Sequence, residues 1–240
     1  MQYTLDMENI IDVAIKNIQK YEPPEGYYVA FSGGKDSIVI LDLVRKSGVK
    51  HDVNFAMTTV DPPEIYSFVK TNYPSINWMK PKKSMFQIIA KRKMPPTRLT
   101  RYCCSELKEI GGKNRVVVTG IRKQESASRR ERLLYEQSTV DKTKWFINPI
   151  IEWETSDVWC YIHMNKLPYP SLYDNGYDRV GCIMCPLQGK RGMLKDKERF
   201  PRFYKAYIRA FDKMLKNYDP CDPPKWKCGE NVMKWWIENS

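Results

Sequence analysis

A short apolar run followed at once by a glycine-containing turn constrains the fold of this chain more than any other feature. Residues Tyr27–Phe31 are few enough for a buried strand, and Ser32-Gly33-Gly34-Lys35-Asp36-Ser37 follows them directly. Ile38, Leu41 and Val44 then recur at helical spacing. This order of strand, glycine turn and helix predicts one unit of a parallel α/β sheet.

Further strands and helices are expected before Gly120. The patterns predict helices at Leu5–Ile18, Glu64–Thr71 and Ser84–Arg92, and strands at Val53–Met57, Ile76–Met79 and Arg115–Thr119. Because strands alternate with helices, we expect a doubly wound, mostly parallel sheet with helices on both faces. The loops after Phe31 and Thr119 both leave carboxyl ends of strands, where such sheets bind ligands, so they should converge.

The pattern changes near Asn148. A helix is predicted near Ser156–Met164, a basic helical stretch at Lys195–Lys216, and a short last helix that ends at Trp235-Trp236. We therefore expect three ranges, a leading helix in 1–25, an α/β domain in 26–150 and a C-terminal helical extension in 151–240. The extension is expected to be an appendage without a core of its own.

Basic residues outnumber acidic residues by 40 to 28, which gives a formal net charge of +12. This excess fits an anionic partner such as a nucleotide, a phosphate-rich substrate or a nucleic acid, although a generally basic surface would give the same count. No apolar run approaches the roughly 20 residues of a membrane span, and Met1–Lys20 lacks the pattern of a signal peptide. A cytoplasmic protein without membrane contact is expected.

The hexapeptide Ser32–Ser37 has the chemistry of a phosphate-binding loop. Its backbone N–H groups and the positive end of the following helix would face a bound anion, and Gly33 and Gly34 let phosphate oxygens approach the backbone. Ser32 and Ser37 can donate hydroxyl hydrogen bonds, and Lys35 adds a positive charge. Asp36 can contact Mg²⁺ or cap the helix. A plain glycine turn with a serine cap is the alternative, and the strand–helix context favours phosphate binding.

Four of the seven cysteines form two pairs far apart in sequence, Cys103-Cys104 and Cys182-x-x-Cys185. In a chain expected in the cytoplasm, such cysteines indicate metal or redox chemistry rather than disulfides. Two distant pairs suggest one four-thiolate site, either zinc or an iron–sulfur cluster. Tandem cysteines do not converge easily on one ion, so they fit a cluster better, and buried free cysteines are the remaining alternative.

Together these motifs resemble a known family. The Ser32–Ser37 hexapeptide is similar to the signature of the PP-loop superfamily, also called adenine nucleotide α-hydrolase-like. The tandem cysteine pair, long gap and C-x-x-C pair resemble its phosphoadenylyl-sulfate (PAPS) reductase family. Thr119–Ser126, Asn148–Ile150 and Leu172–Cys182 carry further matches, so the resemblance spans Phe31–Pro186.

The resemblance implies a doubly wound fold that binds ATP or a related adenylyl nucleotide. The implied nucleotide contacts are Ser32, Gly33, Gly34, Lys35, Asp36, Ser37, Gly120 and Arg122. Adenylyl-sulfate reductases and DNA-phosphorothioation sulfurtransferases of the family hold a [4Fe-4S] cluster with similar cysteines, which implies Cys103, Cys104, Cys182 and Cys185 as ligands here. ATP-using relatives split ATP between the α and β phosphates, giving an adenylylated intermediate and pyrophosphate.

Two features separate the branches of this family. Reductases take adenylyl sulfate or phosphoadenylyl sulfate and usually carry an altered loop, whereas this chain keeps Lys35 and Asp36. That pair suits a β,γ-pyrophosphate and Mg²⁺, which only ATP supplies. Reductases also carry a nucleophilic cysteine in a Glu-Cys-Gly-Leu-His-like tail motif, of which Lys227–Glu230 keeps Cys-Gly alone. The flanking lysines could activate Cys228 as a nucleophile, and a solvent-facing bystander is the alternative.

Arginines follow the second strand-end loop. Planar guanidinium groups suit bidentate contacts with phosphate or sulfate, and the resemblance favours Arg122 for this role. Arg129, Arg130 and Arg132 could contact phosphate as well, or they could form a solvated helix face.

Three functions are compatible with these residues. The favoured one is an AMP-forming ATP pyrophosphatase coupled to sulfur transfer, with Lys35, Asp36 and Arg122 as catalytic residues. The second is a sulfonucleotide reductase that releases sulfite through Cys228. The third is a nucleic-acid-binding subunit with a regulatory nucleotide site, in which basic residues of Lys190–Lys216 contact phosphates. Besides the nucleotide, a nucleic-acid acceptor or a sulfur-donor protein is the expected partner, and the oligomeric state stays open, a homodimer included.

Overall fold

The computed structural model describes residues 2–219, 221 and 224–240. The chain forms two compact units, each assembled from separated stretches of sequence. The first unit contains Met1–Ala56, Glu64–Met79 and Gly111–Val180, and the second contains Met57–Pro63, Lys80–Ile110 and Gly181–Ser240. Each unit combines separated segments, whereas the predicted ranges 1–25, 26–150 and 151–240 are continuous. The three ranges stay a prediction.

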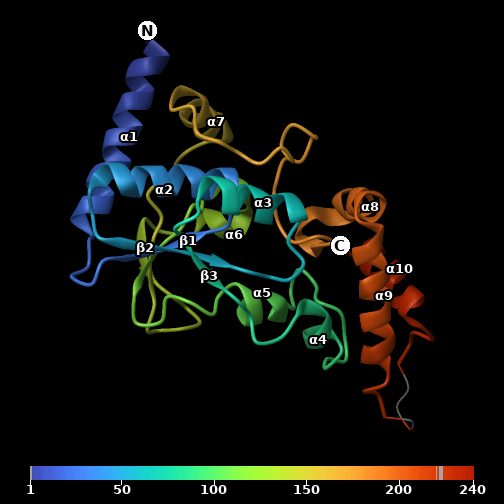
Figure 1. Cartoon of the computed structure of the whole chain (residues 1–240). Helices are drawn as coiled ribbons and strands as arrows, with labels where there is room; N and C mark the ends of the chain where they lie inside the picture. Colours follow the sequence, from blue (N-terminus) through green and yellow to red (C-terminus); the bar gives the residue numbers. More distant parts are fainter. Residues whose placement is uncertain (1, 220, 222–223) are drawn as a thin grey trace. The chain divides into compact units, whose positions relative to one another are not determined.

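A six-stranded sheet forms the centre of the first unit (Figure 1). Its strands are β1 (Tyr27–Phe31), β2 (His51–Ala56), β3 (Asn77–Met79), β4 (Val116–Val118), β5 (Tyr135–Gln137) and β6 (Trp145–Ile147). The spatial order is β3-β2-β1-β4-β6-β5, and all neighbours are parallel except the antiparallel pair of β5 and β6. The mostly parallel α/β sheet predicted from the sequence is confirmed.

Helices connect and accompany these strands. They are α1 (Gln2–Lys20), α2 (Lys35–Ser47), α3 (Pro63–Asn72), the 3₁₀ turn η1 (Lys123–Glu125), α6 (Ala127–Arg130) and α7 (Thr155–Met164). In α2 the predicted repeat of Ile38, Leu41 and Val44 is buried. Gly48 ends this helix with a φ of 75°, a left-handed conformation that glycine adopts readily.

The strand order creates a switch point between β1 and β4. From β1 the chain proceeds to β2 and β3 on one side of the sheet, and β4 then pairs with the other side of β1. Open parallel sheets bind their ligands outside the carboxyl ends of the strands at such a point. The loops that leave β1 and β4 are therefore the structural candidates for a binding site.

The antiparallel β5–β6 pair is absent from the sequence expectations. Each strand has only three residues, and Tyr135 faces Ile147 in the register. The Tyr135 ring stacks on Trp145 with a centroid distance of 5.1 Å and on Tyr21 with 4.6 Å. The contact with Tyr21 joins residues that are distant in sequence, and each strand is too short for a clear alternating pattern.

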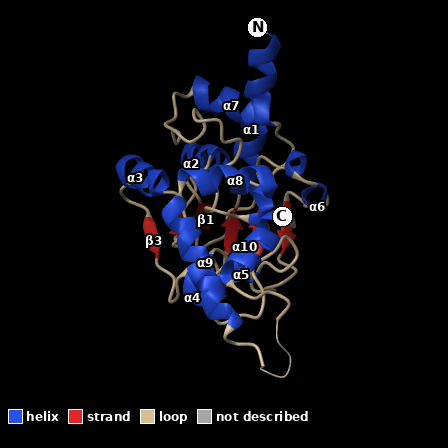
Figure 2. Cartoon of the chain, turned by 90° about the vertical axis from the view of Figure 1, so that its right-hand side faces the viewer, coloured by secondary structure: helices blue, strands red, loops and turns tan. Residues whose placement is uncertain are grey.

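The second unit is helical, and its helices are blue in Figure 2. They are α4 (Met85–Ile89), α5 (Tyr102–Leu107), the 3₁₀ turn η2 (Pro186–Gln188), α8 (Gly189–Arg199), α9 (Pro201–Leu215) and α10 (Gly229–Glu238). The predicted helix Ser84–Arg92 is shorter in the structure, and Ser84 caps it by accepting a hydrogen bond from the backbone N–H of Gln87.

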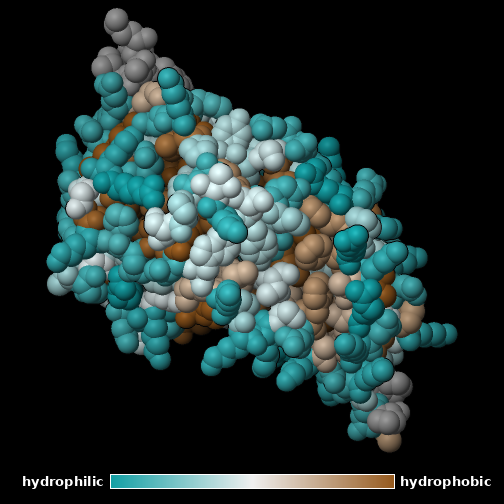
Figure 3. Space-filling model, viewed as in Figure 1, coloured by the Kyte–Doolittle hydropathy of each residue, from teal (hydrophilic) through white to brown (hydrophobic). Residues whose placement is uncertain are grey.

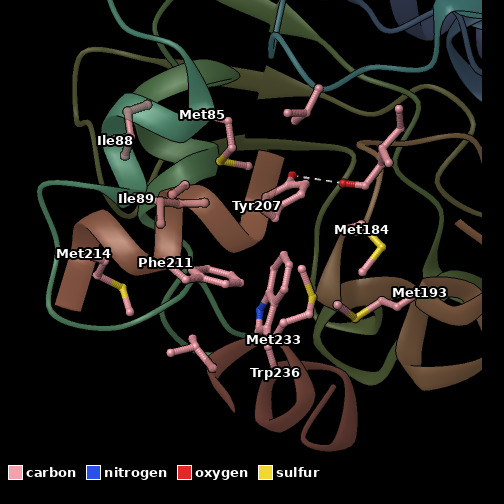
Figure 4. Packing of buried hydrophobic residues seen from close by; sticks show 14 of the residues in the cluster. Met85, Ile88, Ile89, Met184, Met193, Tyr207, Phe211, Met214, Met233 and Trp236 are labelled. Carbon is pink, nitrogen blue, oxygen red and sulfur yellow. Dashed lines mark hydrogen bonds between the residues drawn. The ribbon is translucent and has the colours of Figure 1, made fainter. Parts of the chain in front are cut away.

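This second unit has a hydrophobic core of its own (Figure 4). Ile89 of α4 lies in one buried cluster with Phe211 of α9 and Trp236 of α10. The Tyr207 hydroxyl within it donates to the carbonyl of Ile183 at 3.0 Å. The C-terminal helices do not form this core alone, because residues 57–63 and 80–110 contribute to it from far away in the sequence.

The basic stretch Lys195–Lys216 forms parts of two helices instead of one. Phe200, with φ of −122° and ψ of 57°, separates α8 from α9, and Pro201 begins α9. A proline ring disfavours helical geometry at the preceding residue and is well tolerated at the first helical position. Pro201 therefore explains the break.

Hydrophilic residues cover much of the surface seen in Figure 3. Among the helices of the described residues, none combines the length and the apolar composition that crossing a membrane requires.

Candidate nucleotide site and cysteine group

The loop Ser32–Ser37 connects β1 to α2, as predicted. Gly33 has a φ of 73°, in the left-handed region that favours glycine, and a Cβ there would lie 3.0 Å from Cγ2 of Val69. Gly34 is the N-cap of α2, so Asp36 lies in the first turn and is not the cap. The positive end of the helix dipole therefore lies at this loop.

The two serines of the loop hold its shape. The Ser37 hydroxyl donates to the carbonyl of Gly34 at 2.8 Å and accepts from the backbone N–H of Ser32 at 3.2 Å. The Ser32 hydroxyl in turn donates to the Ser37 oxygen at 3.2 Å. These bonds fix the loop backbone, and a contact between either hydroxyl and a phosphate stays a prediction.

Lys35 is only 6% exposed and faces several partners. Its Nζ lies 3.3 Å from Oδ2 of Asp36, 3.4 Å from the carbonyl of Asp178 and 5.5 Å from the ring centroid of Tyr173. Its backbone N–H donates to the Tyr173 hydroxyl at 2.9 Å. Tyr173 therefore contacts both the amide and the ammonium group of Lys35.

Tyr173 was not singled out in the sequence, although it lies in the Leu172–Cys182 segment that resembles the family. Burial raises the pKa of its hydroxyl, so the group is neutral near neutral pH. A tyrosine in a loop carries no signal for contact with a residue 138 positions earlier in the chain.

Asp36 and Arg122 join the two strand-end loops. The Nε of Arg122 donates to Oδ1 of Asp36 at 2.7 Å, and Arg122 is only 2% exposed. Its Nη1 donates to Gln124 Oε1 at 3.1 Å and to Trp153 O and Thr155 Oγ1 at 3.3 Å each. A Cβ on Gly120 would lie 3.0 Å from the Asp36 backbone, so glycine permits this approach. The predicted convergence of the two loops is confirmed.

The arginines that follow pair within their own segment. Arg129 forms an ion pair with Glu125, and Arg132 forms one with Glu136, both four residues apart. The Arg132 guanidinium also lies 5.3 Å from the Phe146 ring centroid. These contacts favour the interpretation of a solvated surface over that of a phosphate contact.

In the second unit the two cysteine pairs influence one another electrostatically. Cys103 and Cys104 lie on α5, and Cys182 and Cys185 lie in the turn before η2. A hydrogen bond between the Cys103 and Cys104 thiols lowers the pKa of Cys104 and raises that of Cys103. The charges of Cys182 and Cys185 raise the pKa of Cys103 further. The four sulfur atoms therefore interact electrostatically as one group.

Polar and basic side chains of the same unit accompany these thiols. Arg101 donates to Sγ of Cys104 at 3.5 Å, and the Cys182 thiol donates to Oγ1 of Thr58 at 3.4 Å. Burial raises the pKa of Cys182 to about 11, and its interaction with Lys108 opposes this shift. The charge of Cys182 in turn raises the pKa of Lys108.

Lys108 and Thr58 were missed in the sequence. The spacing of Cys104 and Lys108, one helical turn apart, is a signal that could have identified the lysine. Thr58 comes from a distant segment, and no local pattern connects it with Cys182.

A [4Fe-4S] cluster held by the four cysteines stays a prediction. Within the described part of the chain, no three His, Cys, Asp or Glu side chains are grouped closely enough to hold one metal ion. A zinc ion binds each thiolate at about 2.3 Å, so its ligands must crowd around one point. In a cluster each thiolate binds a different iron. Four thiols are the donor chemistry of such clusters, so the residue types present are compatible with one.

Cys228 is the N-cap residue of α10 in the second unit and is half-buried. Its thiol donates to Oε2 of Glu230 at 3.7 Å. The adjacent Gly229 donates its backbone N–H to Oδ1 of Asp212 at 2.6 Å, and a Cβ there would lie 2.4 Å from the carbonyl of Ile208. The Cys-Gly pair therefore has a packing role between α9 and α10, and nucleophilic action of Cys228 stays a prediction.

The sheet and its switch point define the class of this protein, an open α/β fold with a glycine loop at the carboxyl end of β1. Residues 26–188 match the Phosphoadenosine phosphosulfate reductase domain family. The chain belongs to this family, which confirms the family resemblance seen in the sequence.

Relatives of known sequence agree with this membership. An uncharacterized protein of Methanocaldococcus jannaschii is 34% identical over 189 residues, which cover 75% of this chain and 46% of the relative. An adenosine 5'-phosphosulfate reductase of Oceanobacillus iheyensis is 29% identical over 174 residues, which cover 66% of this chain and 70% of the relative. The chain spans less than half the length of the Methanocaldococcus jannaschii relatives that it matches.

Solved structures show the same fold. The phosphoadenylyl-sulfate reductase of Candida auris in a phosphate complex gives a TM-score of 0.54 at 20% identity and covers 73% of this chain and 93% of its own. The FMN adenylyltransferase of Candida glabrata with FMN and an ATP analogue gives a TM-score of 0.55 at 14% identity. The match covers 75% of this chain and 63% of the adenylyltransferase. At these identities the likeness concerns the fold alone.

Proposed function

We propose that the chain binds ATP at Ser32–Ser37 and splits it between the α and β phosphates, forming AMP in a reaction coupled to sulfur transfer. The observation that carries this proposal is the intact Lys35-Asp36 pair, held with Arg122 in one network at the carboxyl end of β1. A lysine can neutralise the β and γ phosphates, and a carboxylate oxygen is a preferred Mg²⁺ ligand. A sulfonucleotide has no β,γ-pyrophosphate that would need this pair.

The bonds change in successive steps in this scheme. An oxygen of the sulfur acceptor would attack the α-phosphorus, the bond from that phosphorus to the oxygen that bridges it to the β-phosphate would break, and pyrophosphate would leave. The terminal sulfur of a donor persulfide would then displace AMP from the acceptor, and a second thiol would cleave the remaining S–S bond, which leaves one sulfur on the acceptor and releases the donor as a disulfide. The positive end of α2 and Lys35 would stabilise the charge that develops on pyrophosphate. Arg122, engaged with Asp36, would act as a positioning residue for that carboxylate.

Cys103, Cys104, Cys182 and Cys185 would hold a [4Fe-4S] cluster in the second unit. When bound, such a cluster would hold or relay sulfur for the transfer. Arg101 and Lys108 bring positive charge to the four thiolates and would offset the negative charge of the site.

A reductase function is the second candidate, and the reductase names of several relatives favour it. In that case Cys228 would attack the sulfur atom of adenylyl sulfate, AMP would leave, and an external thiol would release sulfite. The weak tail motif around Cys228 is the reason for ranking this function second.

Incubation of the chain with ATP and Mg²⁺ tests the proposal. Pyrophosphate should be released, and Asp36→Ala should abolish its release, whereas Asp12→Ala, at an exposed position of α1, should leave it unchanged. Asp36→Ala leaves the buried Arg122 without its carboxylate and could disturb folding, so Lys35→Met serves as a second variant. Circular dichroism checks that each variant folds. Thiol-dependent sulfite formation without pyrophosphate release would reject the proposal.

A further inference from the structure

We propose that the outer face of α9 binds the phosphodiester backbone of a nucleic acid. This inference goes beyond the reaction above and does not depend on it, because α9 belongs to the second unit and the Ser32–Ser37 loop to the first. Five basic residues carry it, Arg202, Lys205, Arg209, Lys213 and the C-cap residue Lys216.

The spacing of the five residues places them on one face. Successive members are three or four residues apart, which confines them to an arc of about 80° at 3.6 residues per turn. From Arg202 to Lys216 the stripe is about 21 Å long at 1.5 Å per residue. At about 3.4 Å per phosphate along one strand of a duplex, this length matches about six successive phosphates.

The opposite face of α9 is fixed in the core. Tyr207, Ala210, Phe211 and Met214 are buried there, and Figure 4 shows Phe211 and Met214 within the cluster. All five basic side chains are exposed. On the side where Figure 1 draws α9, Figure 3 shows hydrophilic residues together with apolar ones. The charge is therefore presented outward by a helix whose orientation in its unit is set by packing.

Basic residues dominate this face, and the exposed acid Asp212 lies beside it, three residues from Arg209 and four from Lys216. A solvated helix face usually mixes acids and bases in pairs three or four residues apart, as Arg129 and Glu125 do on another segment. The one acid within α9, Asp212, accepts the backbone N–H of Gly229 at 2.6 Å. In the residues that the structure describes, no ion pair joins any of the five basic side chains to an acid.

A nucleic acid fits this face better than a lipid surface. A helix that binds at a membrane interface inserts an apolar face between the lipids, and the apolar face of α9 is already occupied by the core. A free nucleotide would neutralise only part of a stripe about 21 Å long. A polymer of regularly spaced phosphates can engage all five charges at once.

Fluorescence anisotropy of the full chain with labelled 20-nucleotide RNA, single-stranded DNA and duplex DNA tests the proposal, and the three arms identify the polymer. The logarithm of the affinity should fall linearly with the logarithm of salt concentration. The triple variant Lys205→Gln, Arg209→Gln, Lys213→Gln should reduce the slope by about 2 to 3 and weaken binding at least about tenfold at low salt.

The matched control is Lys16→Gln, Lys50→Gln, Lys70→Gln, which removes the same charge from exposed positions of the first unit. It should change binding much less than the α9 variant does. The proposal would be overturned if both triple variants lost the same affinity, if binding did not depend on salt, or if none of the three polymers bound. Equally tight binding to phosphatidylserine vesicles, abolished by the α9 triple variant, would also overturn it. Thermal unfolding confirms that both variants fold, and pyrophosphate release, assayed separately, should be unchanged in both.

Discussion

The carboxylate of Asp36 lies 2.7 Å from Nε of Arg122, although the two residues are 86 positions apart in the chain. Asp36 follows β1 and Arg122 follows β4, so this ion pair joins the two loops at the switch point of the sheet. Because Arg122 is almost fully buried, this carboxylate and the acceptors of Nη1 replace the water that would otherwise stabilise its positive charge. The pair is therefore a structural element of the candidate site as well as part of its chemistry.

Replacing Arg122 should destabilise the first unit. Arg122→Gln leaves a carboxylate without its main partner in a partly buried site, which is expected to cost about 3 kcal/mol in the free energy of unfolding. Urea unfolding measures this cost. Arg129→Gln breaks a more exposed ion pair with Glu125 and should cost less than about 1 kcal/mol. Equal, small costs for both variants would contradict the structural role of Arg122.

Removing the Tyr173 hydroxyl should tighten nucleotide binding. This hydroxyl accepts a hydrogen bond from the backbone N–H of Lys35, an amide that a phosphate oxygen would use at the start of α2. Tyr173→Phe frees that amide, and a hydrogen bond worth about 1 kcal/mol corresponds to about a fivefold lower Kd for ATP by isothermal titration calorimetry.

The control for this prediction is the neighbouring Tyr169, whose ring centroid lies 6.5 Å from that of Tyr173. Tyr169→Phe removes a hydroxyl that bonds Asp174 at 3.3 Å, away from the Lys35 amide, and should leave the Kd unchanged. Weaker ATP binding in Tyr173→Phe would mean that the hydroxyl contacts the nucleotide instead of competing with it.

Loss of a single thiol of the cysteine group should remove iron. Protein prepared without oxygen should be brown, and Cys182→Ser should lose the colour together with bound iron and sulfide, because all four thiolates are needed as ligands. Cys160→Ser, on α7 of the first unit, should retain both. A colourless wild-type protein that binds stoichiometric zinc would contradict the cluster.

Cys228→Ser should leave pyrophosphate release from ATP unchanged. The thiol lies at the N-terminus of α10 beside Glu230, and the ATP scheme assigns it no bond-making role. A colorimetric pyrophosphate assay with wild type and variant side by side measures the rates. A fall of about tenfold or more in the variant, with its thermal stability intact, would give Cys228 a role in the reaction.

Local patterns were sufficient for the elements around the loop. The apolar run of β1, the glycine turn and the repeat of Ile38, Leu41 and Val44 lie within one continuous segment, so the sequence predicts them directly. The convergence of the loops after β1 and β4 was also predictable, because parallel strands end at one edge of the sheet. The Asp36–Arg122 pair is the detailed form of that convergence.

Contacts between distant segments were beyond local patterns. The strand β6 has only three residues and pairs with β4, which lies 29 positions earlier in the chain. The core of the second unit combines Ile89 with Phe211 and Trp236, more than one hundred residues later, and no periodicity in the sequence connects them. The contact of Tyr173 with Lys35 also joins segments that are distant in the sequence. Pro201, by contrast, was a readable signal for the break between α8 and α9.

Phosphorus-31 NMR of parallel reactions with ATP and Mg²⁺ and with adenylyl sulfate and a dithiol tests the central claim most directly. We predict signals of AMP and pyrophosphate from ATP, with no ADP, and no sulfite from adenylyl sulfate in a colorimetric assay of the same samples. AMP and sulfite from adenylyl sulfate, with ATP left intact, would contradict the claim that the Ser32–Ser37 loop serves ATP cleavage.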